Sequence, residues 1–121
     1  MEYSIGEFAK LVGLSEYTLR YYEKEGIISL QRNRGQRRFF SEDDINWLDF
    51  IKRLKDTGMP LKEIREYARL RQQGPATMAE RLSLLRRHKA KVLKVIADWR
   101  NNLDNLKAKI AFYEENINSE P

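Results

Sequence analysis

Apolar positions recur at helical spacing through the first 74 residues, and capping residues divide them into short segments. Ser4 and Glu7 have the spacing of a capping box, and the helix that they open ends near Gly13. A second helix begins after Ser15 and ends at Gly26, a residue type that commonly closes helices in a left-handed conformation. Two short helices joined by a tight turn have the proportions of a helix-turn-helix.

Two β-prone runs and two more helices are predicted after this pair. The runs at residues 27–28 and 38–40 flank an arginine-rich loop, which predicts a small β-hairpin, or wing. A capping box then opens a helix between residues 41 and 58, and a fourth helix follows over residues 61–72. We therefore expect a mainly α fold that begins with a winged helix-turn-helix domain over residues 1–74.

From Met78 the apolar pattern changes to a strict alternation of four- and three-residue steps, which is the narrow seam of a coiled coil. Its members are Met78, Leu82, Leu85, Lys89, Val92, Ile96, Trp99, Leu103, Leu106, Ile110, Tyr113 and Ile117, and we assign the dimer contact to the apolar ones from Leu82 to Tyr113. A helix of about 40 residues would be about 60 Å long, too long to pack on the domain before it. Residues 75–121 are therefore expected to form a homodimerisation helix, either parallel or antiparallel.

Some residues of this helix permit other roles. Lys89 interrupts the seam: either its aliphatic stem covers the edge of the stripe while its ammonium stays in water, or it sets the register of the pair. Trp99 and Tyr113 could line a ligand pocket, although packing in the seam explains them better. His88 is the only histidine, and we assign it no role.

Composition excludes several classes of function. The 121 residues include no cysteine and one histidine, which rules out zinc fingers, thiolate metal sites, disulfides and a cysteine nucleophile. No phosphate loop or nucleophile–base pair is present, so we expect neither an enzyme nor a cofactor or metal. No apolar run approaches the roughly 18 residues that span a bilayer, and no signal peptide is recognisable, so a cytoplasmic location without membrane contact is expected.

Positive charge gathers where a polyanion could bind. The net charge is +5, and residues 30–38 hold four arginines and no acidic residue. In the helix before them, Arg20 can pair bidentately with guanine or phosphate, and Tyr17 and Tyr21 can donate hydrogen bonds to phosphate oxygens. We therefore expect double-stranded DNA as the partner, with residues 15–28 containing the helix that reads it.

The order of these elements and several motifs resemble the mercury-resistance-regulator (MerR) family of bacterial transcription factors. The most specific motif is Leu19-Arg20-Tyr21-Tyr22-Glu23 in the second helix. Further matching stretches are Ser4-Ile5-Gly6-Glu7, Gly26-Ile27-Ile28, Phe40-Ser41-Glu42-Asp43-Asp44-Ile45 and Gly58-Met59-Pro60-Leu61. Together the matches cover nearly the whole of residues 2–70.

The resemblance implies a sequence-specific transcriptional regulator that binds an inverted-repeat promoter operator as an antiparallel homodimer. The DNA contacts that it implies come from Tyr17, Thr18, Arg20, Tyr21, Tyr22, Arg37, Arg38 and Lys55. Tyr22, three residues past Leu19, could instead belong mainly to the core. Family members distort promoter DNA so that RNA polymerase can engage it, and the same is expected here. The effector, and the choice between activation and repression, stay open.

The wing departs from the family pattern. Gln36 stands where glycine is usual, and Arg37 and Phe40 stand where tyrosine is usual. Phe40 has no hydroxyl to give to a phosphate, whereas Arg37 adds charge, which predicts a stronger salt dependence of binding. Two other functions stay open: a winged-helix DNA architectural or recombination accessory protein, and a coiled-coil adaptor whose basic patches are incidental.

Overall fold

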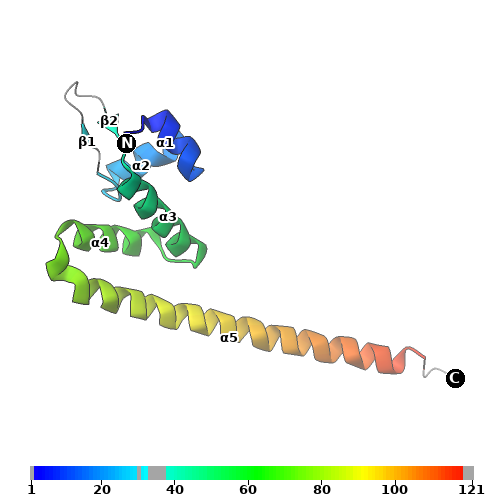
Figure 1. Ribbon diagram of the computed structural model, residues 1–121. Coiled ribbons are helices and arrows are strands. Elements are labelled where there is room, and N and C mark those ends of the chain that lie inside the picture. The colour runs from blue at the N-terminus through cyan, green and yellow to red at the C-terminus, as the bar shows by residue number, and fades with distance from the viewer. Residues whose placement is uncertain (1, 30, 33–37, 119–121) are drawn as a thin grey trace. The chain divides into compact units, whose positions relative to one another are not determined.

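The computed structural model of the protein describes residues 2–29, 31–32 and 38–118 and is mainly helical (Figure 1). The elements are α1 (Ile5–Val12), α2 (Glu16–Lys24), β1 (Gln31–Arg32), β2 (Arg38–Phe39), α3 (Glu42–Asp56), α4 (Leu61–Gln72), the 3₁₀ helix η1 (Pro75–Thr77) and α5 (Met78–Asn116). The chain divides into two compact units, Met1–Leu84 and Leu85–Pro121. The first turns of α5, up to Leu84, therefore belong to the N-terminal unit, and the domain bounds 1–74 and 75–121 stay a prediction.

The helix-turn-helix of α1 and α2 forms where its caps predict it. The Glu7 amide donates to Ser4 Oγ at 3.2 Å, and the Ser4 amide donates to Glu7 Oε1 at 3.1 Å. The hydrogen bond from the Ser4 backbone, followed by that from its side chain, lowers the pKa of the Glu7 carboxyl. Gly13 ends α1 with a φ of 70°, which glycine adopts without strain. Ser15 caps α2 by accepting from the Thr18 amide at 3.0 Å.

Apolar side chains hold α1, α2 and α3 together. Phe8 of α1 stacks on Phe40 with ring centroids 4.2 Å apart. Leu19 of α2 and Leu48 and Ile51 of α3 are at most 1% exposed. Each buried side chain of this size contributes roughly 1.5–3 kcal/mol to stability. This core determines which face of α2 points toward solvent.

Two short strands follow α2. β1 pairs antiparallel with β2, in a register that sets Gln31 opposite Phe39 and Arg32 opposite Arg38. Residues 33–37, on which the predicted wing loop falls, lie outside the described residues.

The strand predicted at residues 27–28 is wrong. The amides of Ile27 and Ile28 both donate to the Tyr22 carbonyl, and Gly26 between helix and turn has a φ of 77°. Both isoleucine side chains are buried in the core. Because these amides close the end of α2, they are not available to a strand ladder.

Two side chains of α4 contact the C-terminal end of α2. Arg65 forms an ion pair with Glu25, the C-cap residue of α2. Gln72 Nε2 donates to the Gly26 carbonyl at 3.3 Å. The turn that ends the second helix is therefore held by side chains about 40 residues further along the chain.

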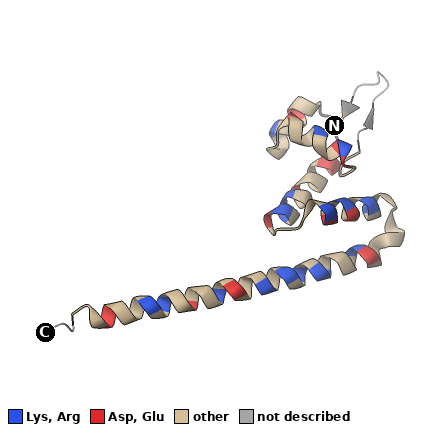
Figure 2. Cartoon of the chain, turned by 180° about the vertical axis from the view of Figure 1, so that it is seen from behind, with Lys and Arg blue, Asp and Glu red and all other residues tan. Residues whose placement is uncertain are grey.

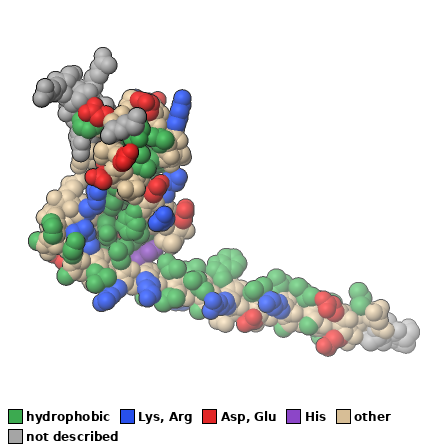
Figure 3. All heavy atoms as spheres, viewed as in Figure 1, with side chains coloured by type: hydrophobic (Ala, Val, Ile, Leu, Met, Phe, Trp, Pro, Cys, Tyr) green, Lys and Arg blue, Asp and Glu red, His purple; other side chains and the backbone are tan. Residues whose placement is uncertain are grey.

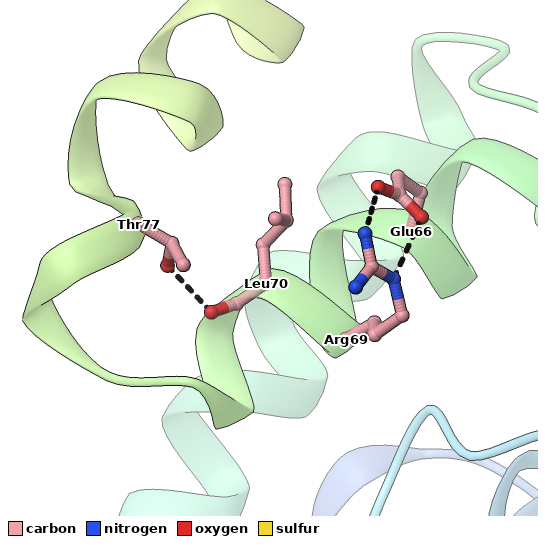
Figure 4. A network of polar contacts seen from close by, with 4 residues as sticks. All are labelled: Glu66, Arg69, Leu70 and Thr77. Atoms are coloured by element: carbon pink, nitrogen blue, oxygen red, sulfur yellow. Dashed lines mark hydrogen bonds and ion pairs between the residues drawn. The ribbon is translucent and has the colours of Figure 1, made fainter.

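The passage from α4 to α5 is fixed by local hydrogen bonds (Figure 4). Thr77 Oγ1 donates to the Leu70 carbonyl at 2.5 Å. On the same helix, Arg69 binds both carboxylate oxygens of Glu66, at 2.6 and 3.0 Å. This pair lowers the pKa of Glu66 through the Arg69 hydrogen bond and raises that of Arg69.

Helix α5 is 39 residues long. Hydrophobic side chains recur along its surface (Figure 3). Within residues 2–29, 31–32 and 38–118, no helix is long and apolar enough to cross a membrane. The exposed apolar side chains of α5 include most of the predicted seam and also Leu93, Val95 and Phe112, which lie outside it.

Candidate nucleic-acid interface

One face of α2 presents large polar side chains to solvent. Tyr17 is 79% exposed and Tyr21 is 40% exposed, and Arg20 is exposed as well. On the opposite face, Leu19 and Tyr22 are only 1% and 2% exposed. Because one face of α2 is buried, the opposite face presents one guanidinium and two phenol hydroxyls to solvent.

Thr18 belongs to the N-terminal cap of α2. Its side chain is half-buried, and its Oγ1 accepts from Ser15 Oγ at 2.9 Å. Its amide donates to the same serine oxygen at 3.0 Å. The threonine hydroxyl proton can still donate outward, so the contact predicted from Thr18 to DNA stays a prediction.

Tyr22 and Lys55 form a pair that links α2 to α3. The Tyr22 ring is buried, and its hydroxyl accepts from Lys55 Nζ at 2.8 Å. The same ammonium lies 5.4 Å from the centroid of the Tyr22 ring. The ring therefore belongs to the core, and the hydroxyl holds the ammonium of an exposed residue in place.

The variant Tyr22→Phe should separate these two roles. It keeps the buried ring and removes the acceptor of the Lys55 hydrogen bond, so we expect the free energy of unfolding to fall by about 1 kcal/mol. Urea denaturation at a fixed protein concentration measures this change. Tyr21→Phe removes an exposed hydroxyl one residue away and should leave the unfolding free energy unchanged; an equal loss in both variants would contradict the assignment.

Lys52 is a positioning residue that the sequence did not reveal. Its Nζ donates to the Val12 carbonyl at the C-terminal end of α1, at 2.8 Å. A cation at this end of a helix is favourable because the last carbonyls carry partial negative charge. The contact joins α3 to the turn of the helix-turn-helix across 40 residues, so no local pattern could have predicted it.

The predicted wing contacts are only partly within the described chain. Arg37 lies outside it, and Arg38 is placed by its backbone in β2. Phe40 is 1% exposed and stacks on Phe8, so its ring is part of the core. The absence of a phosphate contact from position 40 stays a prediction.

The exposed face of α2 can bind a partner through hydrogen bonds and positive charge. Arginine supplies a fork of donors that matches guanine or phosphate, and the tyrosines add single donors. In the part of the chain that the structure describes, no group of three or more histidine, aspartate or glutamate side chains could hold a metal ion.

The seam residues of α5 are exposed in the single chain. The six from Ile96 to Tyr113, at the seam positions given above, are 40–69% exposed. Leu82 is 48% exposed, whereas Leu85 and Val92 are half-buried. A row of large exposed apolar side chains is a surface that a partner can cover, and the dimer contact through these residues stays a prediction.

The capped helix pair with its exposed polar face defines a helix-turn-helix DNA-binding protein. Two family descriptions match the chain: "MerR HTH family regulatory protein" over residues 3–70, and "MerR, DNA binding" over residues 45–109. The chain therefore belongs to the MerR HTH family of regulatory proteins, which confirms the resemblance seen in its motifs.

Similar proteins cover nearly the whole chain. An uncharacterised HTH-type transcriptional regulator of Haemophilus influenzae is 39% identical over 116 residues, which are 95% of this chain and 86% of the relative. HiNmlR, a MerR family regulator lacking the sensor domain and crystallised on promoter DNA, is 38% identical with a TM-score of 0.80, over 96% of this chain and 93% of its own. A MerR family regulator of Bacillus thuringiensis is also 38% identical, with a TM-score of 0.74 over 93% and 100%. The protein is a DNA-binding transcriptional regulator and not an enzyme.

Proposed function

We propose that the protein binds an inverted-repeat promoter operator as a homodimer, with α2 of each copy in a major groove. The observation that carries this proposal is the outward face of α2. Tyr17, Arg20 and Tyr21 are exposed there while Leu19 and Tyr22 are buried behind them. HiNmlR, which resembles this chain over nearly its full length, was crystallised on promoter DNA, and this supports the same partner here.

Contacts to the DNA backbone are proposed to flank this helix. We propose Arg37, Arg38 and Lys55 for these contacts: Arg38 lies in β2, which pairs with β1, and the Lys55 ammonium is held by the Tyr22 hydroxyl. Such contacts orient a protein on the duplex without reading its sequence. Residues 1–74 would thus be the DNA-binding domain and residues 75–121 the dimerisation helix.

The charge distribution of α5 supports an antiparallel dimer. Residues 78–97 contain six basic and one acidic residue, a net charge of +5, and residues 98–117 contain three basic and four acidic residues, a net charge of −1. In Figure 2 the ribbon of the helix is blue at lysine and arginine and red at aspartate and glutamate. A parallel pair would set the two basic halves against each other, whereas an antiparallel pair sets each basic half against the weakly acidic one.

The proposed dimer would act in the cytoplasm by changing the geometry of promoter DNA for RNA polymerase. Bending or untwisting a site of this size costs on the order of 1–6 kcal/mol. A signal that switches the regulator must therefore favour one dimer geometry by a comparable free energy.

Selecting bound sequences from random and genomic DNA should recover an inverted repeat with a fixed half-site spacing. Two copies of α2 related by a twofold axis read two equal half-sites, so the spacing follows from the dimer. Sequencing of the bound fraction measures the symmetry, and its position relative to promoter elements shows whether spacer geometry is involved.

A shape preference without a repeated half-site would favour the architectural function instead. Failure to bind any duplex at low salt would favour the coiled-coil adaptor. A site that overlaps a single promoter element would indicate simple repression rather than distortion of the spacer.

A further inference from the structure

A hollow in the N-terminal unit combines aromatic rings with arginines. It has a volume of about 400 Å³ and lies among α3, α4 and the first turn of α5. Three aromatic residues, Trp47, Phe50 and Tyr67, and two arginines, Arg71 and Arg81, are among the residues that line it. This volume lies within the roughly 300–1,000 Å³ that is common for small-molecule pockets, although the lining is more polar than is usual for them.

The three rings form one connected surface. Trp47 and Tyr67 are nearly parallel, with centroids 5.8 Å apart and an interplanar angle of 18°. Phe50 lies 6.1 Å from Trp47 and 5.4 Å from Tyr67, centroid to centroid. Trp47 is buried, whereas Phe50 and Tyr67 are half-buried and keep part of each ring open to a ligand.

The contacts of Arg71 and Arg81 within the protein leave N–H donors of both side chains available to a ligand. The Arg71 guanidinium lies over the Trp47 ring, with Cζ 4.2 Å from the ring centroid. This cation–π contact uses no N–H donor, so the donors of Arg71 remain available to a ligand. Arg81 donates to Thr77 Oγ1 and to the Gly74 carbonyl, both at 3.1 Å, which leaves further donors on the same fork.

The charge of these two arginines is not balanced by an ion pair among residues 2–29, 31–32 and 38–118. Arg69, on the same helix as Arg71, is by contrast bound to Glu66. Asp43 and Asn46 also line the hollow. The Asp43 carboxylate repels an anion, so the anionic end of a ligand is expected beside the arginines rather than beside Asp43.

We propose that this hollow is a binding site for a small planar carboxylate. The ring of the ligand would lie against Phe50 and Tyr67, and its carboxylate would bind the edge donors of Arg71 and Arg81. Neutral aromatic molecules and non-aromatic acids each satisfy only half of this arrangement.

The site also adjoins the end of the DNA-reading helix. Trp47 Nε1 donates to the Ile27 carbonyl at 2.8 Å, and Ile27 directly follows the glycine that closes α2. A ligand that rests on the aromatic wall therefore contacts the side chain that anchors this turn. We infer that occupancy changes operator affinity; this second part rests on the proposed function.

Nuclear magnetic resonance of the ¹⁵N-labelled full chain tests the site with benzoate as the probe. The chain has two tryptophans, so Trp47 and Trp99 give two indole N–H signals, which Trp99→Phe assigns. At constant ionic strength, benzoate should shift the Trp47 signal saturably and leave that of Trp99 in place. Benzamide, the neutral analogue, and cyclohexanecarboxylate, the non-aromatic acid, should each bind at least about tenfold more weakly, which corresponds to the loss of one such interaction.

Arg71→Gln should weaken benzoate binding at least about tenfold, whereas Arg69→Gln, the same change two residues away, should not alter it. Absence of a saturable Trp47 shift, equal binding of benzamide or of cyclohexanecarboxylate, or equal affinity in Arg71→Gln would overturn the site.

The effect on regulation is tested by measuring operator affinity with and without saturating benzoate. A change in the wild type but not in Arg71→Gln supports regulation, and an unchanged affinity overturns it. If the wild type binds no operator even without benzoate, yet benzoate still shifts the Trp47 signal, the result counts against the proposed function and leaves the site standing.

Discussion

Replacing Arg20 with alanine is expected to abolish operator binding while the fold and the dimer stay intact. A bidentate arginine contact to a base is worth roughly 1–3 kcal/mol, and a homodimer loses two of them. The expected decrease in affinity is therefore at least about thirtyfold. Because the side chain of Arg20 is exposed, its removal leaves the core unchanged. Fluorescence anisotropy with a labelled operator duplex measures the affinity.

The matched control for this variant is Arg69→Ala. It removes the same charge from another exposed helical position, where the arginine is paired with Glu66. Operator affinity should stay within about threefold of the wild type, since only a surface ion pair is lost. Circular dichroism and sedimentation establish that both variants are folded dimers. Selective, full-affinity binding by Arg20→Ala would show that α2 does not read the operator.

Replacing Leu103 with aspartate is expected to convert the dimer to monomers. Leu103 is a seam position near the middle of α5 and is 47% exposed in the single chain. The substitution puts one unpaired carboxylate per copy into the apolar interface, which costs several kcal/mol. Sedimentation velocity over a concentration series measures the dissociation. Operator affinity should fall as well, because two linked half-site contacts become two independent ones.

Asn101→Asp is the control for the seam variant. It introduces the same charge two residues away, at an exposed position outside the seam. Its dimer should dissociate at the same protein concentration as the wild-type dimer. A stable dimer of Leu103→Asp, or equal dissociation of both variants, would place the interface on another face of α5.

Local chemistry predicted most of the elements correctly. The capping box of Ser4 and Glu7 and the closing glycines at positions 13 and 26 bound helices where they were expected. The long helix also follows its apolar period, since α5 covers Met78–Asn116 without a break. These signals are reliable because capping and helical periodicity act between residues three or four positions apart.

The strand expected at residues 27–28 shows the limit of local patterns. Two adjacent isoleucines favour β-structure by propensity. Their amides instead close α2, and their side chains fill the core under the helix-turn-helix. Tertiary burial decided the conformation, because the free energy of burying both side chains exceeds the small preference for a strand.

The features of the candidate site also separate into those that the sequence predicted and those that only the structure showed. From the sequence alone came the capped helix pair, the Arg-Tyr-Tyr motif that begins at Arg20, the family resemblance and the heptad seam. Only the tertiary structure decided that Tyr22 is buried and holds Lys55, that Lys52 caps α1, and that Trp47 meets Arg71 beside a hollow. The reason is physical: helices and their caps depend on neighbours in the chain, whereas these contacts join residues 24 to 40 positions apart, which only the packed core brings together.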